Sequence, residues 1–396
     1  MTVETVSTSS PIPPPLDAAR ALAPRIRARA AWIDAERRLP DDLVRELAAA
    51  GLFRMAVPPE DGGGGADLLT VLRTIEAVSA ADGSTGWCVA MGVNTFRHSA
   101  QFPEHVRREL FSSDPVGVSA GSATPRGDAR AVAGGYRVTG RWQFASGCMH
   151  ASSLHGACHI FEGDAPRLLP TGEQEVRIAY FYPKTVAEIV DTWAVSGMRG
   201  TGSHDVVVDD LFVPEERTFS AAERRARVTG PVNSIPGFDL AGCGFACVGL
   251  GVARAAIDAL IELALAKTPR FATTLLRERP LVQAQVGEAE AVLRSGRAFL
   301  FEVAGRMADD AAAGQPITAA QRAELRLAMT HAAQGAARAT HLMSVAAGTT
   351  SIFTASPLER YARDAEVVTR HVQLQYPNYE AVGRTLLGLE STSPLF

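Results

Sequence analysis

One stretch of the chain, residues 140–159, concentrates side chains that could do chemistry. Its sequence, GRWQFASGCMHASSLHGACH, holds three histidines and two cysteines together with Ser146. Imidazole and thiolate groups are the usual zinc ligands, and a serine beside a histidine can act as a nucleophile. These residue types are therefore compatible with a metal site, a nucleophilic site or the wall of a cofactor pocket.

The spacing of these groups argues against a zinc site. Tetrahedral zinc needs three or four convergent ligands, and the five candidates repeat no common zinc-finger spacing. They are Cys148, His150, His155, Cys158 and His159. Strand-like residues surround them, and successive side chains of a strand point to opposite faces. We expect no bound metal, which disfavours a metal-dependent hydrolase or a zinc-stapled binding module.

The chain divides into three regions that differ in their hydrophobic patterns, and the elements of these regions must position any functional site. Residues 16–115 and 229–396 show apolar residues at three- and four-residue spacing, which predicts helices. Residues 116–228 contain short β-branched and aromatic runs bounded by glycine, proline and aspartate, which predict strands. Residues 1–15 read as a flexible lead. The sequence thus predicts a mainly α-helical fold with a central β-domain.

The predicted strands lie at 136–147, 177–183, 193–198 and 204–214. In the first of them, Tyr136, Val138, Gly140, Trp142 and Phe144 share one parity and should face one side of a sheet. After about residue 235 the helical pattern returns in long segments, and residues 376–388 are expected to form a last helix. The βαβ alternation of a doubly wound sheet is missing.

Composition and short motifs exclude several function classes. The formal net charge of −4, without a basic tail, disfavours nucleic-acid binding. The longest apolar run, 240–253, is too short and too rich in glycine for a membrane span. The GGGGA run at 62–66 follows no predicted strand, so a phosphate-binding loop is not expected there.

Cysteine usage and the N-terminus bear on localisation. Five cysteines at irregular spacing fit a reducing cytoplasm better than a disulfide framework. The first fifteen residues have no basic start and no apolar core, so they do not read as a signal peptide. We expect a cytoplasmic enzyme.

Four phrases, in order along the chain, resemble the acyl-CoA dehydrogenase superfamily. They are LPDDLVRELAAAGLFRMAVPPEDGGGGAD, YRVTGRWQFASG, DTWAVSGMRGTGSHDVVVDDLFVPEERT and SPLERYARDAEV. The resemblance runs from about residue 18 to residue 390. It implies an N-terminal helical domain, a β-barrel-like middle domain and a C-terminal four-helix bundle. It also implies a flavin between the β-domain and the bundle, and a homotetramer or homodimer.

The superfamily contains dehydrogenases and oxygenases, and these differ in their catalytic residues. The dehydrogenases resembled here use a glutamate base in one of two places, which correspond to Val372 and Ala241 in this sequence. Neither residue is a carboxylate, although Glu366 and Glu380 lie nearby in the sequence. An acyl-CoA dehydrogenase or a related flavin-dependent desaturase is therefore the alternative function.

The oxygenase branch carries a histidine about seven residues after an Arg-Asp pair, and His371 stands at that spacing from Asp364. A histidine can hold a proton near neutral pH, donate a hydrogen bond or accept a phenol proton. A surface histidine at a helix end is the plain alternative. The resemblance implies hydroxylation of an aromatic, polycyclic or amine-bearing molecule through a flavin hydroperoxide. FAD, or FMN as the alternative, would arrive reduced from a separate NAD(P)H-dependent flavin reductase, and O₂ would be the second substrate.

The resemblance also suggests individual site residues. His371 and Ser146 are the expected catalytic residues, with Ser146 as hydrogen-bond donor to the reactive edge of the flavin. Some aromatic hydroxylases have a histidine where this chain has Thr95, so Asn94 and His98 are candidate pocket residues in its place, and Cys243 and Cys247 are on a helix that could line the pocket. The expected cofactor-binding residues are Trp142, Phe144, Ser146, Arg199, Thr201, Ser203, Arg270, Gly348 and Thr349.

Several of these residues also have a purely structural interpretation. Trp142 could pack inside the β-domain, Arg199 could form an ion pair, and the two cysteines could be small packing residues. Gly348 and Thr349 are expected to contact the nucleotide of a neighbouring subunit. In the opening stretch, Cys148 and His150 are expected at the pocket edge, whereas His155, Cys158 and His159 are expected to fill the β-domain.

Overall fold

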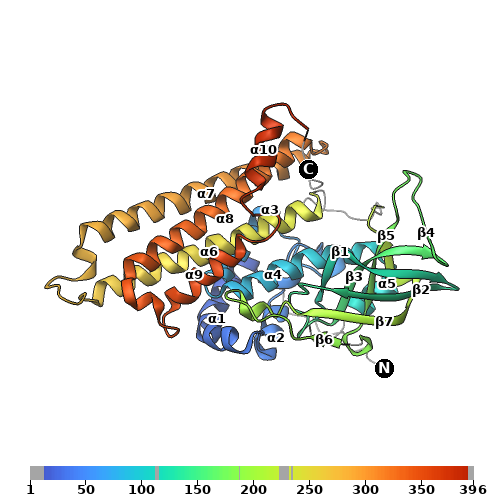
Figure 1. The fold of residues 1–396 in the computed structure, drawn as a ribbon, viewed down its shortest axis with the longest axis horizontal. Coiled ribbons are helices and arrows are strands. Elements are labelled where there is room, and N and C mark those ends of the chain that lie inside the picture. The colour runs from blue at the N-terminus through green and yellow to red at the C-terminus, as the bar shows by residue number, and fades with distance from the viewer. Residues whose placement is uncertain (1–12, 112–115, 187, 223–231, 233–234, 391–396) are drawn as a thin grey trace, which may run out of the picture.

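The computed structural model describes residues 13–111, 116–186, 188–222, 232 and 235–390. Most of the expected lead, 1–12, lies outside these residues. The chain begins with helices and then forms a sheet, and it ends in a bundle of long helices (Figure 1). The N-terminal helices are α1 Pro15–Glu36, α2 Asp41–Ala49, α3 Leu68–Ser79, α4 Gly83–Phe96 and α5 Glu104–Phe111.

The strands of the middle region form one sheet within the described residues. Its order is β6-β7-β2-β1-β3-β5-β8, with β4 paired to β3. Only the β1–β3 pairing is parallel among the pairings found there. The strands are β1 Ser119–Val132, β2 Gly135–Trp142, β3 Ser153–Glu162, β4 Ala165–Pro166, β5 Val176–Phe181, β6 Glu188–Val190, β7 Asp205–Pro214 and β8 Thr218–Ser220.

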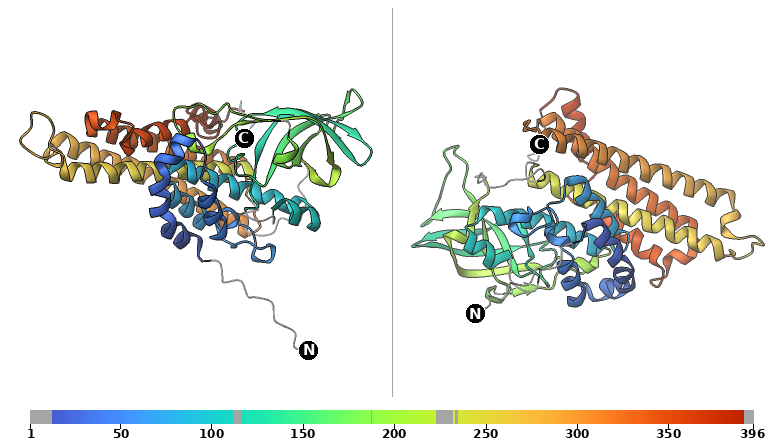
Figure 2. Two further views of the ribbon diagram at one scale, coloured as in Figure 1. Left: turned by 90° about the horizontal axis from the view of Figure 1, so that it is seen from below. Right: turned by 180° about the vertical axis from the view of Figure 1, so that it is seen from behind.

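The C-terminal region packs long helices side by side, at the opposite end of the molecule from the strands (Figures 1 and 2). α6 packs on α8 and α9, and α8 packs on α7. The helices are α6 Gly237–Ala266, α7 Pro280–Ala312, α8 Ala319–Ala347, α9 Pro357–Val368 and α10 Asn378–Leu386. The helix expected at 376–388 is therefore present as α10. Apart from Pro15, the first residue of α1, which belongs to the expected lead, the described elements fall inside the three expected regions, and we propose 16–115, 116–228 and 229–396 as the domain boundaries.

Helix α4 joins the two ends of the molecule, because it packs against both α6 and β1. It starts after Asp82, whose carboxylate accepts a hydrogen bond from the backbone N–H of Thr85 at 2.8 Å. Such an N-cap satisfies one of the free amides at a helix start. Most of α4 is buried, but Trp87, Met91 and Asn94 are only half-buried. Their spacing places them on one face of the helix.

Helix α6 is apolar almost all round and lies inside the protein. It is the one helix in the described part of the chain that is long and apolar enough to cross a membrane, and 94% of its apolar window is buried. A helix that is hydrophobic on every side is buried in a large core. The expectation of no membrane span is consistent with this burial.

The expected strand at 193–198 is wrong. This segment is an irregular loop between β6 and β7. Its backbone groups bond to side chains rather than to a neighbouring strand: Arg363 donates to the carbonyl of Ser196, and Asp364 accepts from the N–H of Met198. We call residues 191–204, which connect β6 to β7, the 191–204 loop.

Candidate functional site

Three aromatic rings from three separate segments meet at the junction of α4, α6 and the chain after α9. Trp87 stacks on Phe245 with ring centroids 4.1 Å apart and an interplanar angle of 9°. The ring of His371 meets both edge-on, at 4.6 Å from Phe245 and 5.6 Å from Trp87. Edge-on and stacked pairs of this kind are favoured arrangements of aromatic rings. We call Trp87, Phe245 and His371 the aromatic cluster.

The environment of His371 fixes its protonation state. Burial, together with the smaller effect of the positive charge of Arg326, lowers its pKa to about 4. The ring is therefore neutral near pH 7. Its Nδ1 accepts a hydrogen bond from the backbone N–H of Gln373 at 3.3 Å. A neutral imidazole whose Nδ1 is an acceptor carries its proton on Nε2, so His371 presents an Nε2–H donor.

A chain of hydroxyl groups starts beside the aromatic cluster. The Trp87 Nε1–H donates to Ser146 Oγ at 3.2 Å. Ser146 Oγ lies 2.7 Å from Ser203 Oγ, which lies 2.7 Å from Thr201 Oγ1. Thr201 donates to the carbonyl of Met198 at 2.8 Å. We call Ser146, Ser203 and Thr201 the hydroxyl chain.

The direction of each hydrogen bond in the hydroxyl chain follows from its last member. Thr201 has one hydroxyl proton and gives it to Met198, so it accepts from Ser203. Ser203 in turn accepts from Ser146. Ser146 therefore donates inward and accepts from Trp87. To donate to a bound ligand, as expected from the sequence, its hydroxyl must rotate away from Ser203.

An exposed aromatic surface lies next to the hydroxyl chain. Phe144 is 66% exposed and has a left-handed backbone, with φ of 62°. A non-glycine residue in that region is strained, and such strain often occurs at functional sites. Its ring contacts the edge of Trp193 at 6.0 Å. Phe144 lies just after the end of β2. Its side chain is exposed and does not continue the buried face of that strand.

Trp142 does not take part in this site, which corrects the expectation that it packs on the flavin ring. Its side chain is fully buried in the β-domain and its Nε1–H donates to Ala157 at 2.8 Å. Gly127 and Gly156 make room for the indole, since a Cβ at either residue would lie within 2.3 Å of it. Tyr136, Val138 and Trp142 therefore lie on one buried face of the sheet, as their alternate spacing predicted. Trp142 is the largest of the three.

Arg199 was also expected to bind the flavin, but its side chain makes structural contacts instead. Its guanidinium donates to the backbone carbonyls of Asp34 and Val195, at 3.0 and 3.4 Å, and lies 3.7 Å from the Asp34 carboxylate. These contacts tie the 191–204 loop to α1. The structural ion pair, which the sequence left open, is the arrangement observed.

Cys243 and Cys247 do not line the site, contrary to expectation. They are 1% and 0% exposed. Burial raises the pKa of both thiols well above the usual range. Two residues further along the helix from Cys243, Phe245 points to the other side and joins the aromatic cluster. Sequence reasoning identified the correct helix but the wrong face, and it missed Phe245 and Trp87 as site residues.

The two candidates on α4 and just beyond it lie apart from the aromatic cluster. Asn94 is half-buried two helical turns from Trp87, near Gly237 at the start of α6. His98 lies one turn further, where its Nδ1 is 2.6 Å from the hydroxyl of Tyr180. Burial lowers the pKa of His98 to about 4. The structure therefore places His98 in a polar contact between the helices and β5, and Asn94 remains a candidate for the far end of a pocket.

The proposed nucleotide-binding residues lie together at the distal end of the bundle. Arg270 follows α6, while Gly348 and Thr349 follow α8. Lys267 links the two segments, because its Nζ donates to Ala347 and Thr350 at 2.7 and 2.6 Å. Lys267 stands twenty-two residues after Phe245 on α6, or about 33 Å at the usual helical rise. A single chain thus does not bring these three residues to its own hydroxyl chain.

In the part of the chain that the structure describes, the histidine- and cysteine-rich stretch contributes to no group of three side chains that could hold a metal ion. His155 and Cys158 are buried, as expected for β-domain filling. Cys148 is buried too, and its thiol donates to Gly202 at 3.3 Å. Burial raises the pKa of Cys148 to about 11, so it is an unreactive thiol and not a pocket-edge group. His150 is neutral, because burial lowers its pKa to about 4.

Comparisons with known proteins agree with this arrangement. Residues 16–105 match the family model described as acyl-CoA dehydrogenase, N-terminal domain, and residues 243–376 match acyl-CoA dehydrogenase, C-terminal domain. The fold and the site thus define a member of the acyl-CoA dehydrogenase superfamily, to which the chain belongs.

Within that superfamily the similarity is to monooxygenases. The chain is 35% identical to indole-3-acetate monooxygenase of Pseudomonas putida, with 92% of this chain and 91% of that protein covered. It is 30% identical to the flavin-dependent monooxygenase oxygenase subunit HsaA of Rhodococcus jostii, at 89% and 92% coverage. The solved structure of XiaF from Streptomyces sp. in complex with FADH₂ and glycerol matches with a TM-score of 0.87, at 25% identity and 96% coverage of both chains. The protein is a flavin-dependent monooxygenase, the oxygenase component that works with a flavin reductase.

The residues present fit a flavin. An isoalloxazine ring offers a flat apolar face and an edge of nitrogen and oxygen atoms. The exposed ring of Phe144 and the half-buried Trp193 can contact such a face, while the hydroxyl chain can bond to such an edge. Ser146 is the member of the hydroxyl chain that contacts the aromatic cluster, through Trp87.

Replacing Ser146 by alanine should therefore weaken the coupling between flavin oxidation and product formation. The change removes both the acceptor of the Trp87 N–H and the donor to Ser203, and we expect about tenfold less product per reduced flavin consumed, which is in the range for the loss of side-chain hydrogen bonds. The control is Ser295→Ala on the exposed side of α7. Equal coupling in Ser146→Ala and wild-type protein would remove Ser146 from the site.

Proposed function

We propose that this oxygenase hydroxylates an aromatic or polycyclic small molecule, at a substrate position beside the aromatic cluster. The observation that carries the proposal is the meeting of His371 with Trp87 and Phe245 directly next to the hydroxyl chain. Flat apolar rings favour a flat apolar substrate through stacking. An amine-bearing substrate is the variant of this proposal that the sequence left open.

Each part of the site has a distinct task in this proposal. When bound, reduced flavin supplies two electrons and activates O₂, so that one oxygen atom enters the substrate and the other leaves as water. The neutral His371 donates a hydrogen bond from Nε2 at the reacting centre. The half-buried Trp87 contacts the substrate ring, Phe245 packs behind it, and together they exclude water, which limits the wasteful release of hydrogen peroxide.

The flavin is proposed to be FAD, reduced by a separate NAD(P)H-dependent flavin reductase, with FMN as the other candidate. FAD is supported by the complex of the structural relative XiaF with FADH₂. Its diphosphate would be bound by Arg270, Gly348 and Thr349 of a neighbouring subunit, since these residues lie far from the hydroxyl chain of their own subunit. A homotetramer or homodimer in the cytoplasm is therefore proposed.

The structure supports the alternative dehydrogenase function less well. A dehydrogenase needs a carboxylate base at the reacting carbon. Of the two nearby candidates in the described chain, Glu366 pairs with Arg370 on an exposed face of α9, and Glu380 is exposed on α10. Neither contacts the aromatic cluster.

A reaction with labelled dioxygen tests the proposal. The protein is mixed with chemically reduced FAD or FMN, isotopically labelled O₂ and indole-3-acetate, the substrate in the name of one relative. Simple phenols and a polycyclic phenol serve as further aromatic probes. We expect labelled oxygen in an aromatic product and a transient that absorbs in the near ultraviolet. Bleaching of bound oxidised flavin by an acyl-CoA, without labelled product from any aromatic probe, would support the dehydrogenase instead.

A further inference from the structure

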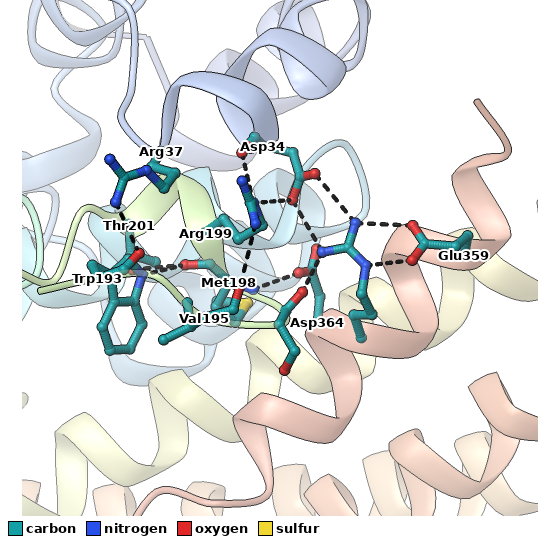
Figure 3. Close-up of polar contacts among 11 residues, drawn as sticks. Asp34, Arg37, Trp193, Val195, Met198, Arg199, Thr201, Glu359 and Asp364 are labelled. Atoms are coloured by element: carbon teal, nitrogen blue, oxygen red, sulfur yellow. Dashed lines mark hydrogen bonds and ion pairs between the residues drawn. The ribbon is translucent and has the colours of Figure 1, made fainter. Parts of the chain in front are cut away.

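A buried carboxylate connects the C-terminal bundle to the flavin-facing loop. Asp364 on α9 is 2% exposed, and its Oδ1 accepts the backbone N–H of Met198 at 2.6 Å. Met198 has a left-handed backbone, with φ of 53°. A non-glycine residue keeps such a conformation only when its surroundings hold it in place. The hydrogen bond from Asp364 is the contact that holds the Met198 amide (Figure 3).

The same residue is the end point of the hydroxyl chain. The Met198 carbonyl accepts from Thr201 Oγ1 at 2.8 Å and from the Trp193 indole at 3.0 Å. Asp364 therefore holds the N–H of the residue whose carbonyl anchors the hydroxyl chain, which extends from there to Trp87 in the aromatic cluster. A backbone fixed at Met198 N fixes the position of its carbonyl across a single Cα.

Asp364 also contacts the helix that carries Trp87. A Cβ built on Gly83, the first residue of α4, would lie 3.6 Å from Asp364 Oδ2. Trp87 follows Gly83 by one helical turn. The carboxylate therefore lies between the 191–204 loop and the start of α4, and His371 follows it by seven residues in the chain. The 191–204 loop, the start of α4 and the segment that leads to His371 therefore all meet at Asp364.

Ionic contacts around Asp364 keep the loop and the helices in register. Arg363 donates to Glu359 on its own helix, to Asp34 on α1, and to the Ser196 carbonyl in the loop. Figure 3 shows Arg199 reaching the same Asp34 from the loop. At Gly197 the loop lies so close to α9 that a Cβ would be 2.3 Å from the Arg363 carbonyl. The loop is thus seated directly on α9.

We propose that Asp364 is a positioning residue for the monooxygenase reaction: by holding the backbone of Met198 it keeps the hydroxyl chain in place beside the aromatic cluster. This inference rests on the proposed function, in which the hydroxyl chain faces the flavin. Asp364 itself touches neither flavin nor substrate. Asp364 acts by fixing the position of Ser146. That position affects how much oxygen is transferred to the substrate and how much is released as hydrogen peroxide.

Three variants test the proposal. Asp364→Ala removes the acceptor, and Asp364→Asn keeps a carbonyl oxygen for the Met198 N–H. Val368→Ala, one turn further on the buried side of α9, is the matched control for a general loss of stability. Two quantities are measured: amide hydrogen exchange of residues 197–203 in flavin-free protein, and product formed per reduced FAD oxidised, with indole-3-acetate as the probe substrate.

The alanine variant should exchange amides 197–203 about tenfold faster than wild type and lose coupling by a similar factor, as expected for loss of one buried hydrogen bond. Asp364→Asn should stay within about threefold of wild type in both, because it retains the acceptor. Val368→Ala should leave both unchanged at an equal loss of thermal stability. If the alanine variant does not fold, Asp364→Leu fills the same space without an acceptor and takes its place.

The proposal is overturned if exchange of 197–203 in the acceptor-free variant is no faster than in Val368→Ala. It is also overturned if exchange rises while coupling stays at the wild-type value. If wild-type protein makes no oxygenated product from any probe, the proposed function fails, and the exchange comparison alone still decides whether Asp364 holds the loop.

Discussion

Replacing His371 by alanine is expected to lower the yield of oxygenated product by about two to three orders of magnitude while reduced flavin is still oxidised. The ring is the polar member of the aromatic cluster, and the Gln373 N–H on its Nδ1 leaves Nε2–H as the donor. Without that donor, oxygen should leave as hydrogen peroxide instead of entering the substrate. Product and peroxide are measured in the same reaction by chromatography and a peroxide assay.

Two further variants separate a hydrogen-bond donor from a base. His371→Gln places an amide N–H near the position of Nε2 and should recover part of the coupling, whereas a base would not be replaced by an amide. His341→Ala, on an exposed face of α8, is the control and should behave as wild type. Full coupling in His371→Ala, or no difference between alanine and glutamine variants, would contradict a donor role.

The pKa of His371 gives this prediction a pH signature. Burial holds its pKa near 4, below its ordinary value of 6.5, so the ring is neutral in the folded protein over that whole interval. The Nε2–H donor is thus present throughout, and coupling should not change through protonation of His371 between these two values. Protonation below about pH 4 would cost the Nδ1 acceptor and its bond from Gln373.

The sequence predicted the architecture because each region repeats its own local pattern over many residues. It also identified Ser146, Thr201, Ser203 and His371, which the structure places around one junction. These residues lie in short phrases shared with a known superfamily, so resemblance supplied what spacing could not. Proximity between residues as distant in sequence as Ser146 and His371 is a property of the fold alone.

The failures have specific physical causes. Helix α6 is apolar on every side, so its sequence does not show which face borders the aromatic cluster; Cys243 was chosen, whereas Phe245 is the residue that packs on Trp87. Trp87 has one half-exposed face on a buried helix, a signal that appears only once burial is known. Residues 193–198 have strand-like composition, but strands need partners, and here the backbone bonds to side chains of α9 and of Arg37, which follows α1.

Trp142 illustrates a conflict between two kinds of sequence evidence. Its parity with Tyr136 and Val138 predicted a buried sheet face, whereas resemblance to the strand beside the flavin suggested contact with the ring. The structure agrees with the parity, because the indole is enclosed by β-domain residues and by two glycines. A side chain without exposed surface cannot stack on a cofactor, so its role should be stability.

Trp142→Phe should accordingly destabilise the protein by about 1–3 kcal/mol, and Trp142→Ala by about 3–5 kcal/mol. The phenylalanine variant loses part of the buried ring and leaves the Ala157 carbonyl without its 2.8 Å donor. The alanine variant also leaves a cavity against Gly127 and Gly156. Chemical denaturation with and without bound flavin measures the change, and folded Trp142→Phe should bind reduced FAD within about twofold of wild type, because a substitution distant from a binding site acts independently of it.

Trp32 on α1 is the matched control, since it is the same residue type but 36% exposed. Trp32→Phe should cost no more than about 0.5 kcal/mol, as is usual for surface substitutions. Trp142→Phe could instead weaken FAD binding by tenfold or more, with a stability loss no larger than that of Trp32→Phe. That result would show that Trp142 contacts the flavin. The opposite pattern, large stability loss with unchanged flavin affinity, follows from an indole that fills the β-domain core and supports the site only by keeping its sheet folded.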